Sequence, residues 1–192
     1  MNRIKHILHY MGHKGPADNN LEQLISSSLD ELNKVSDPRH VMIQLPCNLK
    51  DNIISIDSIK IESSGLAERL YNCTGVYIFA ATLGAEVDRL IFSRSKIDSS
   101  VSLCIQACAS AQIEDYCNNI ENELSYDLGK RGLKINPRFS PGYSDFDISH
   151  QTDILRLLSA DKKIGLCETK AHMLTPLKSV SGIIGFYLKD EK

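Results

Sequence analysis

The 192-residue sequence lacks the features of two large groups of proteins, those that bind nucleic acids and those that span membranes. Its 22 lysine and arginine residues are outnumbered by 24 aspartates and glutamates, whereas binding to a phosphate backbone requires an excess of positive charge. No stretch approaches the roughly 18 apolar residues of a membrane span, and the N-terminus lacks the apolar run of a signal peptide. We therefore expect a cytoplasmic protein with neither nucleic acid nor a membrane as a partner.

The common catalytic and metal-binding motifs are also missing. The sequence has no H-E-x-x-H pair, no G-x-S-x-G turn, and no glycine-rich loop of the kind that holds a nucleotide phosphate. Its six cysteines form no C-x-x-C pair, so we expect reduced thiols rather than disulfides or a zinc site. Cys104 and Cys108 share a helix face, but no further ligands accompany them, and we expect them to be buried as small hydrophobic side chains. The sequence therefore predicts no metal site.

The hydrophobic residues, 42% of the chain, are enough to bury the core of one domain. Their spacing predicts both helices and strands, which are mixed without strict alternation and so favour a single α+β domain over residues 1–192. We expect Ser149 to cap the last helix. Helices are predicted over residues 19–35, 65–71, 85–92, 101–128 and 150–160, and strands over residues 40–45, 53–61, 75–84, 133–139 and 180–188.

The most informative segment is the turn Arg138-Phe139-Ser140-Pro141-Gly142-Tyr143. An arginine fork fits a carboxylate with two hydrogen bonds, Pro-Gly lets the backbone approach a ligand and exposes its amides, and a tyrosine offers a ring face and a hydroxyl. These groups together suit a zwitterionic amino-acid ligand. The spacing alone does not distinguish such a site from a surface Pro-Gly turn with a packed tyrosine.

Four linked elements resemble the activation domain of cobalamin-dependent methionine synthase, in its compact, separately encoded form. They share its order and approximate spacing, and the resemblance is strongest over residues 73–187. It implies a twisted antiparallel sheet with flanking helices. The four elements are the R-x-x-x-G-Y turn at 138–143, the acidic and aromatic stretch 144–147, the helix 151–158 and the M-x-x-P-x-x-S-V-S-G segment at 173–182.

The resemblance implies that S-adenosylmethionine is bound by Arg138 at its carboxylate, by the backbone of Pro141 and Gly142, and by Tyr143, which also approaches the corrinoid and is the catalytic candidate. A family glutamate falls on Glu114, where a carboxylate could meet the ammonium or sulfonium group. Two features depart from the family pattern. An aromatic hydroxyl after S-V-S-G is matched by Ile184, so that contact is lost or supplied by Tyr187, and an N-terminal acid has no match.

The implied function is the reactivation of an oxidised corrinoid. The domain docks on a cobalamin-binding methionine synthase subunit, presents S-adenosylmethionine, and supports remethylation of cob(II)alamin with electrons from a flavodoxin-like donor. Cobalamin belongs to the partner, because the D-x-H-x-x-G signature is absent from this sequence. Two alternatives remain open: a docking module that controls a corrinoid protein without methyl transfer, and an unrelated S-adenosylmethionine-dependent methyltransferase, although the glycine-rich loop and β-α-β alternation of the common methyltransferase fold are missing.

Overall fold

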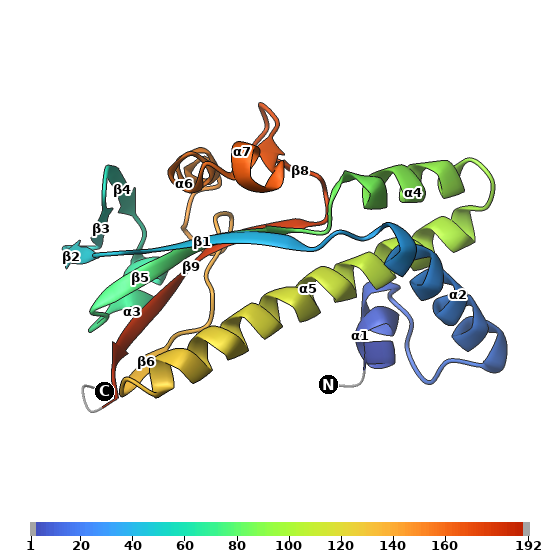
Figure 1. The fold of residues 1–192 in the computed structure, drawn as a ribbon, viewed down its shortest axis with the longest axis horizontal. Coiled ribbons are helices and arrows are strands. Elements are labelled where there is room, and N and C mark those ends of the chain that lie inside the picture. Colours follow the sequence, from blue (N-terminus) through green and yellow to red (C-terminus); the bar gives the residue numbers. More distant parts are fainter. Residues whose placement is uncertain (1–2, 190–192) are drawn as a thin grey trace.

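The computed structural model of the chain describes residues 3–189, and its centre is a four-stranded antiparallel sheet (Figure 1). The strand β5 forms the middle of this sheet and pairs with β1 on one side and β9 on the other. Its side chains are buried on both faces, which explains the continuous apolar run in the sequence. The strands in spatial order are β1 (Arg39–Leu45), β5 (Gly75–Thr82), β9 (Ser179–Leu188) and β6 (Leu133–Ile135).

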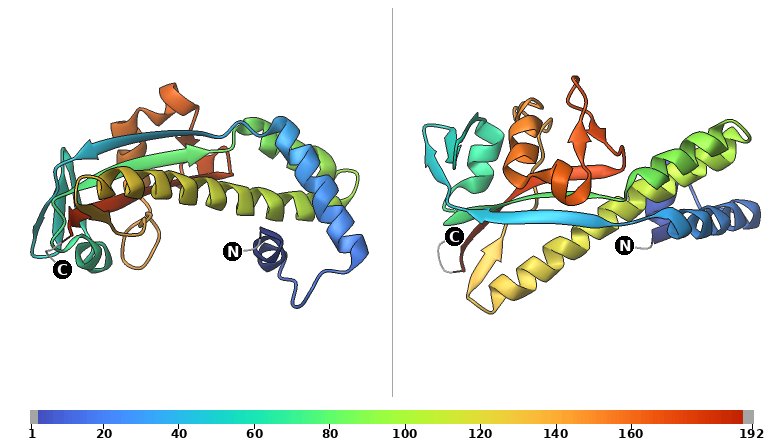
Figure 2. Two further views of the ribbon diagram at one scale, coloured as in Figure 1. Left: turned by 60° about the horizontal axis from the view of Figure 1, so that its bottom comes forward. Right: turned by 45° about the horizontal axis from the view of Figure 1, so that its top comes forward.

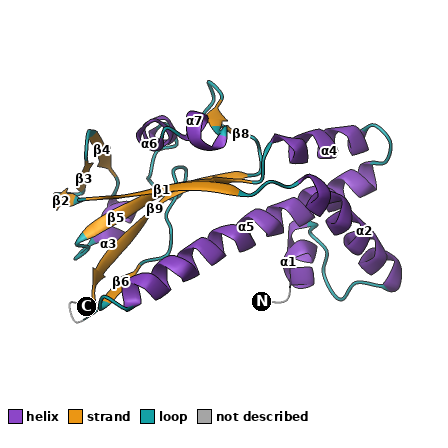
Figure 3. Cartoon of the chain, in the orientation of Figure 1, coloured by secondary structure: helices purple, strands orange, loops and turns teal. Residues whose placement is uncertain are grey.

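One face of the sheet packs against the helix α5 (Ser99–Gly129), whose 31 residues span about 46 Å at the usual helical rise. This helix continues past the sheet into an arm of helices (Figures 2 and 3). Cys104 and Cys108 are buried in this core, as expected. None of the helices in the described part of the chain combines the length and apolar character needed to cross a bilayer. The helices packed on α5 in the arm are α1 (Arg3–Tyr10), α2 (Asn19–Val35) and α4 (Ala85–Ser95).

The opposite face of the sheet carries a second core. Alternation along β5 divides its side chains between the two cores, because Ile78 and Ala80 point to this face and Phe79 and Ala81 to α5. Figure 1 shows α6 and α7 on this side of the sheet and α5 on the other. The elements of this layer are β2 (Asn48–Lys50), β3 (Ile53–Ile56), β4 (Ile59–Glu62), α3 (Ser64–Leu70), α6 (His150–Leu158), α7 (Ala160–Ile164), β7 (Cys167–Glu168) and β8 (Leu174–Thr175).

The predicted α+β class is confirmed, but several predicted boundaries are wrong. The strand expected over residues 53–61 is the hairpin of β3 and β4, which turns at Asp57 with a φ of 50°. The last predicted helix breaks at Ser159, which adopts a left-handed conformation with a φ of 50°. Ser149 stands at the N-cap position of that helix, as expected, but it has helical dihedrals and its side chain makes no capping hydrogen bond. The helix α1 was not expected.

The strand predicted over residues 133–139 also differs, and the difference positions the site. Strand β6 ends at Ile135, although the Asn136 N–H still donates to the Gly185 carbonyl of β9 at 2.9 Å. After a short bulge the chain pairs again with the same edge of β9, where Phe139 exchanges two backbone hydrogen bonds of 2.9 Å with Ile183. Gly182 lies beside this bridge. A Cβ atom there would lie 3.1 Å from both the Phe139 carbonyl oxygen and the buried Phe79 ring, so glycine permits the close approach.

We therefore predict that Gly182→Ala lowers the free energy of unfolding by about 1–3 kcal/mol, because neither the backbone oxygen nor the buried ring can move away without strain. Gly129→Ala is the control, since its Cβ would meet no atom within 4 Å at the end of α5 and should be neutral or slightly stabilising. Urea unfolding of both variants measures the difference. Equal stability of the two variants would mean that the Phe139 backbone and the Phe79 ring move aside without strain.

Candidate ligand-binding site

A cavity of about 780 Å³ lies at the edge of β9 that β6 leaves uncovered. Its volume is in the range of small-molecule sites. Its walls come from α5, from residues 137–143 after β6, from the start of β9, and from the segment around β8. The lining includes Glu114, Asn118, Glu121, Arg138, Pro141, Tyr143, Ile148, Gln151, His172, Met173, Leu177 and Ser181.

Arg138 lies on the wall of this cavity between two carboxylates. Its Nη1 donates to Asn118 Oδ1 at 2.9 Å and to Glu121, and its Nη2 donates to Glu114. The three partners are spaced by four and three residues along α5, so they share one helix face. Burial disfavours the charged guanidinium, but the hydrogen bond and charge of Glu121, together with the charge of Glu114, outweigh it and raise the pKa of Arg138.

The turn after Arg138 holds its own backbone amides. Pro141 and Tyr143 line the cavity, whereas Gly142, with a φ of 90°, lies between them and is not part of the wall. The Gly142 N–H donates to the Phe146 carbonyl at 2.7 Å and the Tyr143 N–H to the Ser140 carbonyl at 3.3 Å. The expectation that the Pro-Gly turn exposes its amides is therefore wrong. The Tyr143 side chain is 66% exposed and is not a core residue.

The rim of the cavity is apolar and its floor is polar. Tyr143, Ile148, Met173 and Leu177 are large exposed apolar side chains on the rim. In the floor, Gln151 Nε2 donates to Ser181 Oγ at 2.6 Å, and both residues are buried. Such a division suits a ligand with a polar end inside and an apolar contact at the opening.

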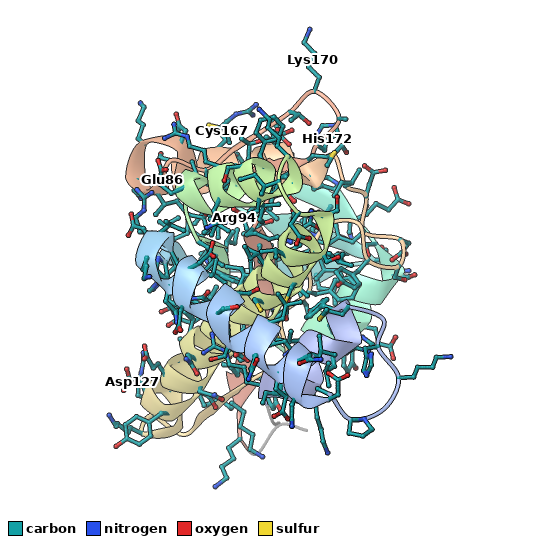
Figure 4. All side chains as sticks on the ribbon, turned by 90° about the vertical axis from the view of Figure 1, so that its right-hand side faces the viewer. Glu86, Arg94, Asp127, Cys167, Lys170 and His172 are labelled. Atoms are coloured by element: carbon teal, nitrogen blue, oxygen red, sulfur yellow. The ribbon has the colours of Figure 1, made fainter. Side chains whose placement is uncertain are left out.

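His172 lies on the wall formed by the loop between β7 and β8, which projects from the molecule with Lys170 near its tip (Figure 4). Its Nδ1 lies 3.1 Å from Glu168 Oε2 and 3.4 Å from Thr152 Oγ1. Among residues 3–189, no group of three or more potential ligands could hold a metal ion. The histidine thus contributes hydrogen-bonding capacity to the loop.

The structure adds residues that the sequence argument did not identify. Asn118 and Glu121 could have been found from Glu114, because they follow it at helical spacing. Tyr10, at the end of α1, lines a smaller cavity of about 220 Å³ that shares Glu114 with the first. Burial, and after it the charges of Glu114 and Tyr143, raise the pKa of Tyr10.

The position of the missing aromatic hydroxyl, Ile184, and its proposed substitute, Tyr187, both lie outside the lining of this cavity. Ile184 is completely buried in the core beside α5. Tyr187 is also buried, and it lines a different cavity that lies beside α3. The expectation that Tyr187 replaces the family contact is therefore not met by the arrangement of β9, because residues 184 and 187 face opposite sides of the strand.

Comparison with solved structures identifies the fold. The chain matches the crystal structure of the MetH reactivation domain bound to AdoHcy, with a TM-score of 0.69 over 97% of this chain and 70% of that chain. The sequence identity is 19%, so the match establishes the fold alone. No family model and no curated protein matches the sequence. The antiparallel fold that the resemblance implied is confirmed.

The end of the 138–147 segment is attached to α3 by Asp145. Its carboxylate accepts hydrogen bonds from Ser64 Oγ and N, both at 2.6 Å, from Ser63 Oγ at 2.7 Å and from Gly65 N at 3.0 Å. The bonds from the Ser64 and Ser63 hydroxyls, followed by those from the amides, hold the pKa of Asp145 well below its ordinary value. This carboxylate therefore anchors the loop that carries Tyr143.

We predict that Asp145→Asn lowers the melting temperature at pH 7, because one amide oxygen cannot accept four hydrogen bonds from α3. A carboxyl whose folded pKa is lowered stabilises the fold above its unfolded pKa, and this contribution is lost as the pH falls toward the folded pKa. The difference between wild type and variant should therefore be full at pH 6–7 and shrink below pH ~4. Thermal unfolding across this pH range measures it, with the exposed Asp30→Asn on α2 as control. A difference that does not change with pH would contradict the assignment.

Proposed function

We propose that this chain is a reactivation module that binds S-adenosylmethionine, docks on a cobalamin-binding methionine synthase partner, and supports reductive remethylation of cob(II)alamin to methylcobalamin. The observation that carries the proposal is the position of the R-x-x-x-G-Y turn. It places Arg138 and Tyr143 on the wall of a ligand-sized cavity, beside Glu114. The fold is the one found in a reactivation domain that was crystallised with AdoHcy.

The charged groups of the cavity suit an amino acid that also carries a sulfonium. Arginine has five N–H donors, and three of those on Arg138 bind partners among the described residues. The remaining two are available for a ligand carboxylate. Glu114 is partly exposed and can accept from the ammonium group or lie beside the sulfonium. The carboxylate of the proposed ligand and one of its two cationic groups therefore have a partner in this wall.

The part of this chain in the reaction is positioning. S-adenosylmethionine supplies the methyl group, which together with one electron from a flavodoxin-like donor converts cob(II)alamin to methylcobalamin. The polar floor and Arg138 hold the amino-acid end inside, so the reacting group lies toward the open rim at Tyr143. Fixing the reactants in this way can lower a barrier by about 7–11 kcal/mol at most. The exposed apolar rim provides the surface that a corrinoid protein would cover.

A docking module without methyl transfer is the second candidate, favoured by the burial of Ile184 and by the pairing of Arg138 with two carboxylates. The two functions differ in calorimetry. A docking module should give no heat with S-adenosylmethionine but should still bind a cobalamin-binding domain, whereas a reactivation module should bind both. The common methyltransferase fold is contradicted, because it is built on a mostly parallel sheet. Here the pairs β1–β5, β5–β9 and β6–β9 are all antiparallel.

We predict that Arg138→Ala weakens S-adenosylmethionine binding by about ten- to a hundredfold, since a charge-assisted hydrogen bond contributes about 1.5–3 kcal/mol. Arg138→Lys should restore stability more completely than affinity, because it keeps the counter-charge for Glu114 and Glu121 but loses the planar fork. Isothermal calorimetry gives the affinities and thermal unfolding gives the stabilities. A folded Arg138→Ala variant with wild-type affinity would make Arg138 a structural residue.

Tyr143→Phe should fold with an unchanged melting temperature, because the side chain is largely exposed. We predict that it slows remethylation by about two- to tenfold, the effect of losing one hydrogen bond at the reacting centre. The measurement is single-turnover methylation with a cob(II)alamin-loaded partner domain, reductant and S-adenosylmethionine. Exposed Tyr126→Phe on α5 is the matched control. Lost stability with unchanged turnover per folded molecule would disprove the role of Tyr143.

A further inference from the structure

The two carboxylates that hold Arg138 are not equivalent. The side chain of Glu121 is 16% exposed and that of Glu114 is 30% exposed, while Arg138 itself is 17% exposed. Glu121 also shares the Nη1 group of Arg138 with Asn118, so that end of the guanidinium is held from two positions on α5. Because shielding from water strengthens an ion pair, the contact with Glu121 is the harder one to exchange.

Glu114 is the carboxylate that an incoming ligand can reach. It lines both the large cavity and the smaller one beside Tyr10, whereas Glu121 lines the large cavity alone of these two. A cationic group that enters either space meets Glu114. If Glu114 turned away while Arg138 had no second partner, a largely buried guanidinium would be left without a counter-ion, which is costly. Glu121 removes that cost.

The charges of the cluster add up to an excess of one carboxylate. Arg138 contributes one positive charge, and Glu114 and Glu121 contribute two negative charges. With Arg138 neutralised by Glu121, the charge of Glu114 is available to a cation. A sulfonium is such a cation, but the thioether that remains after methyl transfer is uncharged.

We propose that Glu121 is a positioning residue that keeps Arg138 in place, so that Glu114 can exchange its contact with Arg138 for the sulfonium of the ligand and thereby select it over an uncharged thioether. This inference rests on the proposed function. After methyl transfer the sulfur is uncharged, so Glu114 returns to Arg138 and the thioether of the product has no charged partner. Glu121 acts through Arg138 and Glu114 without touching the ligand.

The binding test is a double-mutant cycle on ligand preference. Isothermal calorimetry measures the affinities of S-adenosylmethionine and S-adenosylhomocysteine for wild type, Glu114→Gln, Glu121→Gln and the double variant. Wild type should prefer the sulfonium on the order of tenfold. Each single variant should lose that preference, since in Glu121→Gln the remaining Glu114 must stay on Arg138. The double variant should lose no more than either, because the two residues act as one unit.

Two controls accompany the cycle. Asp127→Asn removes one negative charge from the same helix near its far end, away from the loop of His172 (Figure 4), and should keep the wild-type preference. Glu121→Asp retains the charge on a shorter side chain and should keep part of it. Additive losses in the double variant, or an unchanged preference in Glu121→Gln, would overturn the proposal.

A measurement without ligand separates this proposal from the proposed function. The guanidinium NMR signals of Arg138 should persist in Glu114→Gln and broaden in Glu121→Gln, and the melting temperature should fall further in Glu121→Gln. If Glu121→Gln does not fold while Glu114→Gln does, the order of stability holds, and Glu121→Asp provides the binding data. The reverse order would refute the role of Glu121 whether or not any ligand binds. Absence of S-adenosylmethionine binding to wild type, with the expected order intact, would instead reject the proposed function.

Discussion

The backbone pairing of Phe139 with the edge of β9 is the constraint on which the candidate site depends. Helix α5 is fixed to the sheet by a buried core, and β6 follows it directly along the neighbouring edge of β9. The chain then bulges away from that edge, and the two hydrogen bonds between Phe139 and Ile183 determine where it pairs with β9 again. Because Arg138 immediately precedes Phe139, this bridge places its guanidinium against the face of α5 that carries Glu114 and Glu121. Gly182 permits the approach, since a side chain there would meet the Phe139 carbonyl.

The other end of the loop is held by an interaction of a different kind. Asp145 accepts four hydrogen bonds at the start of α3, where helical N–H groups have no partner within the helix. The loop is thus attached at Phe139 and at Asp145, with the Pro-Gly turn and Tyr143 between them. Tyr143 remains exposed although the segment around it is fixed, which is the arrangement expected of a side chain that meets a partner rather than a core.

The sequence was informative where a pattern extended over many residues. The apolar spacing of residues 19–35 and 101–128 predicted two helices close to their observed bounds, because each contains enough turns to average out exceptions. It failed where a single residue changes the chain direction: Asp57 and Ser159 adopt positive φ values that their residue types do not require. In the site, the family resemblance brought together Arg138 and Glu114, which the fold joins in an ion pair. Periodicity could place Glu121 on the same helix face as Glu114, but it could not show that Arg138 contacts both, or that Tyr10 arrives from another helix, because those contacts are tertiary.

The charge balance of the Arg138 cluster separates a binding role from a stabilising one. A largely buried ion pair contributes little to stability after desolvation, and a second carboxylate adds repulsion without a further cation. A cluster selected for stability would contain one carboxylate, or apolar side chains of similar size. The proposed role accounts for the excess negative charge. In that role Glu114 turns to a cation that enters the cavity, and Glu121 keeps Arg138 paired. The unequal burial of the two glutamates divides these tasks between them.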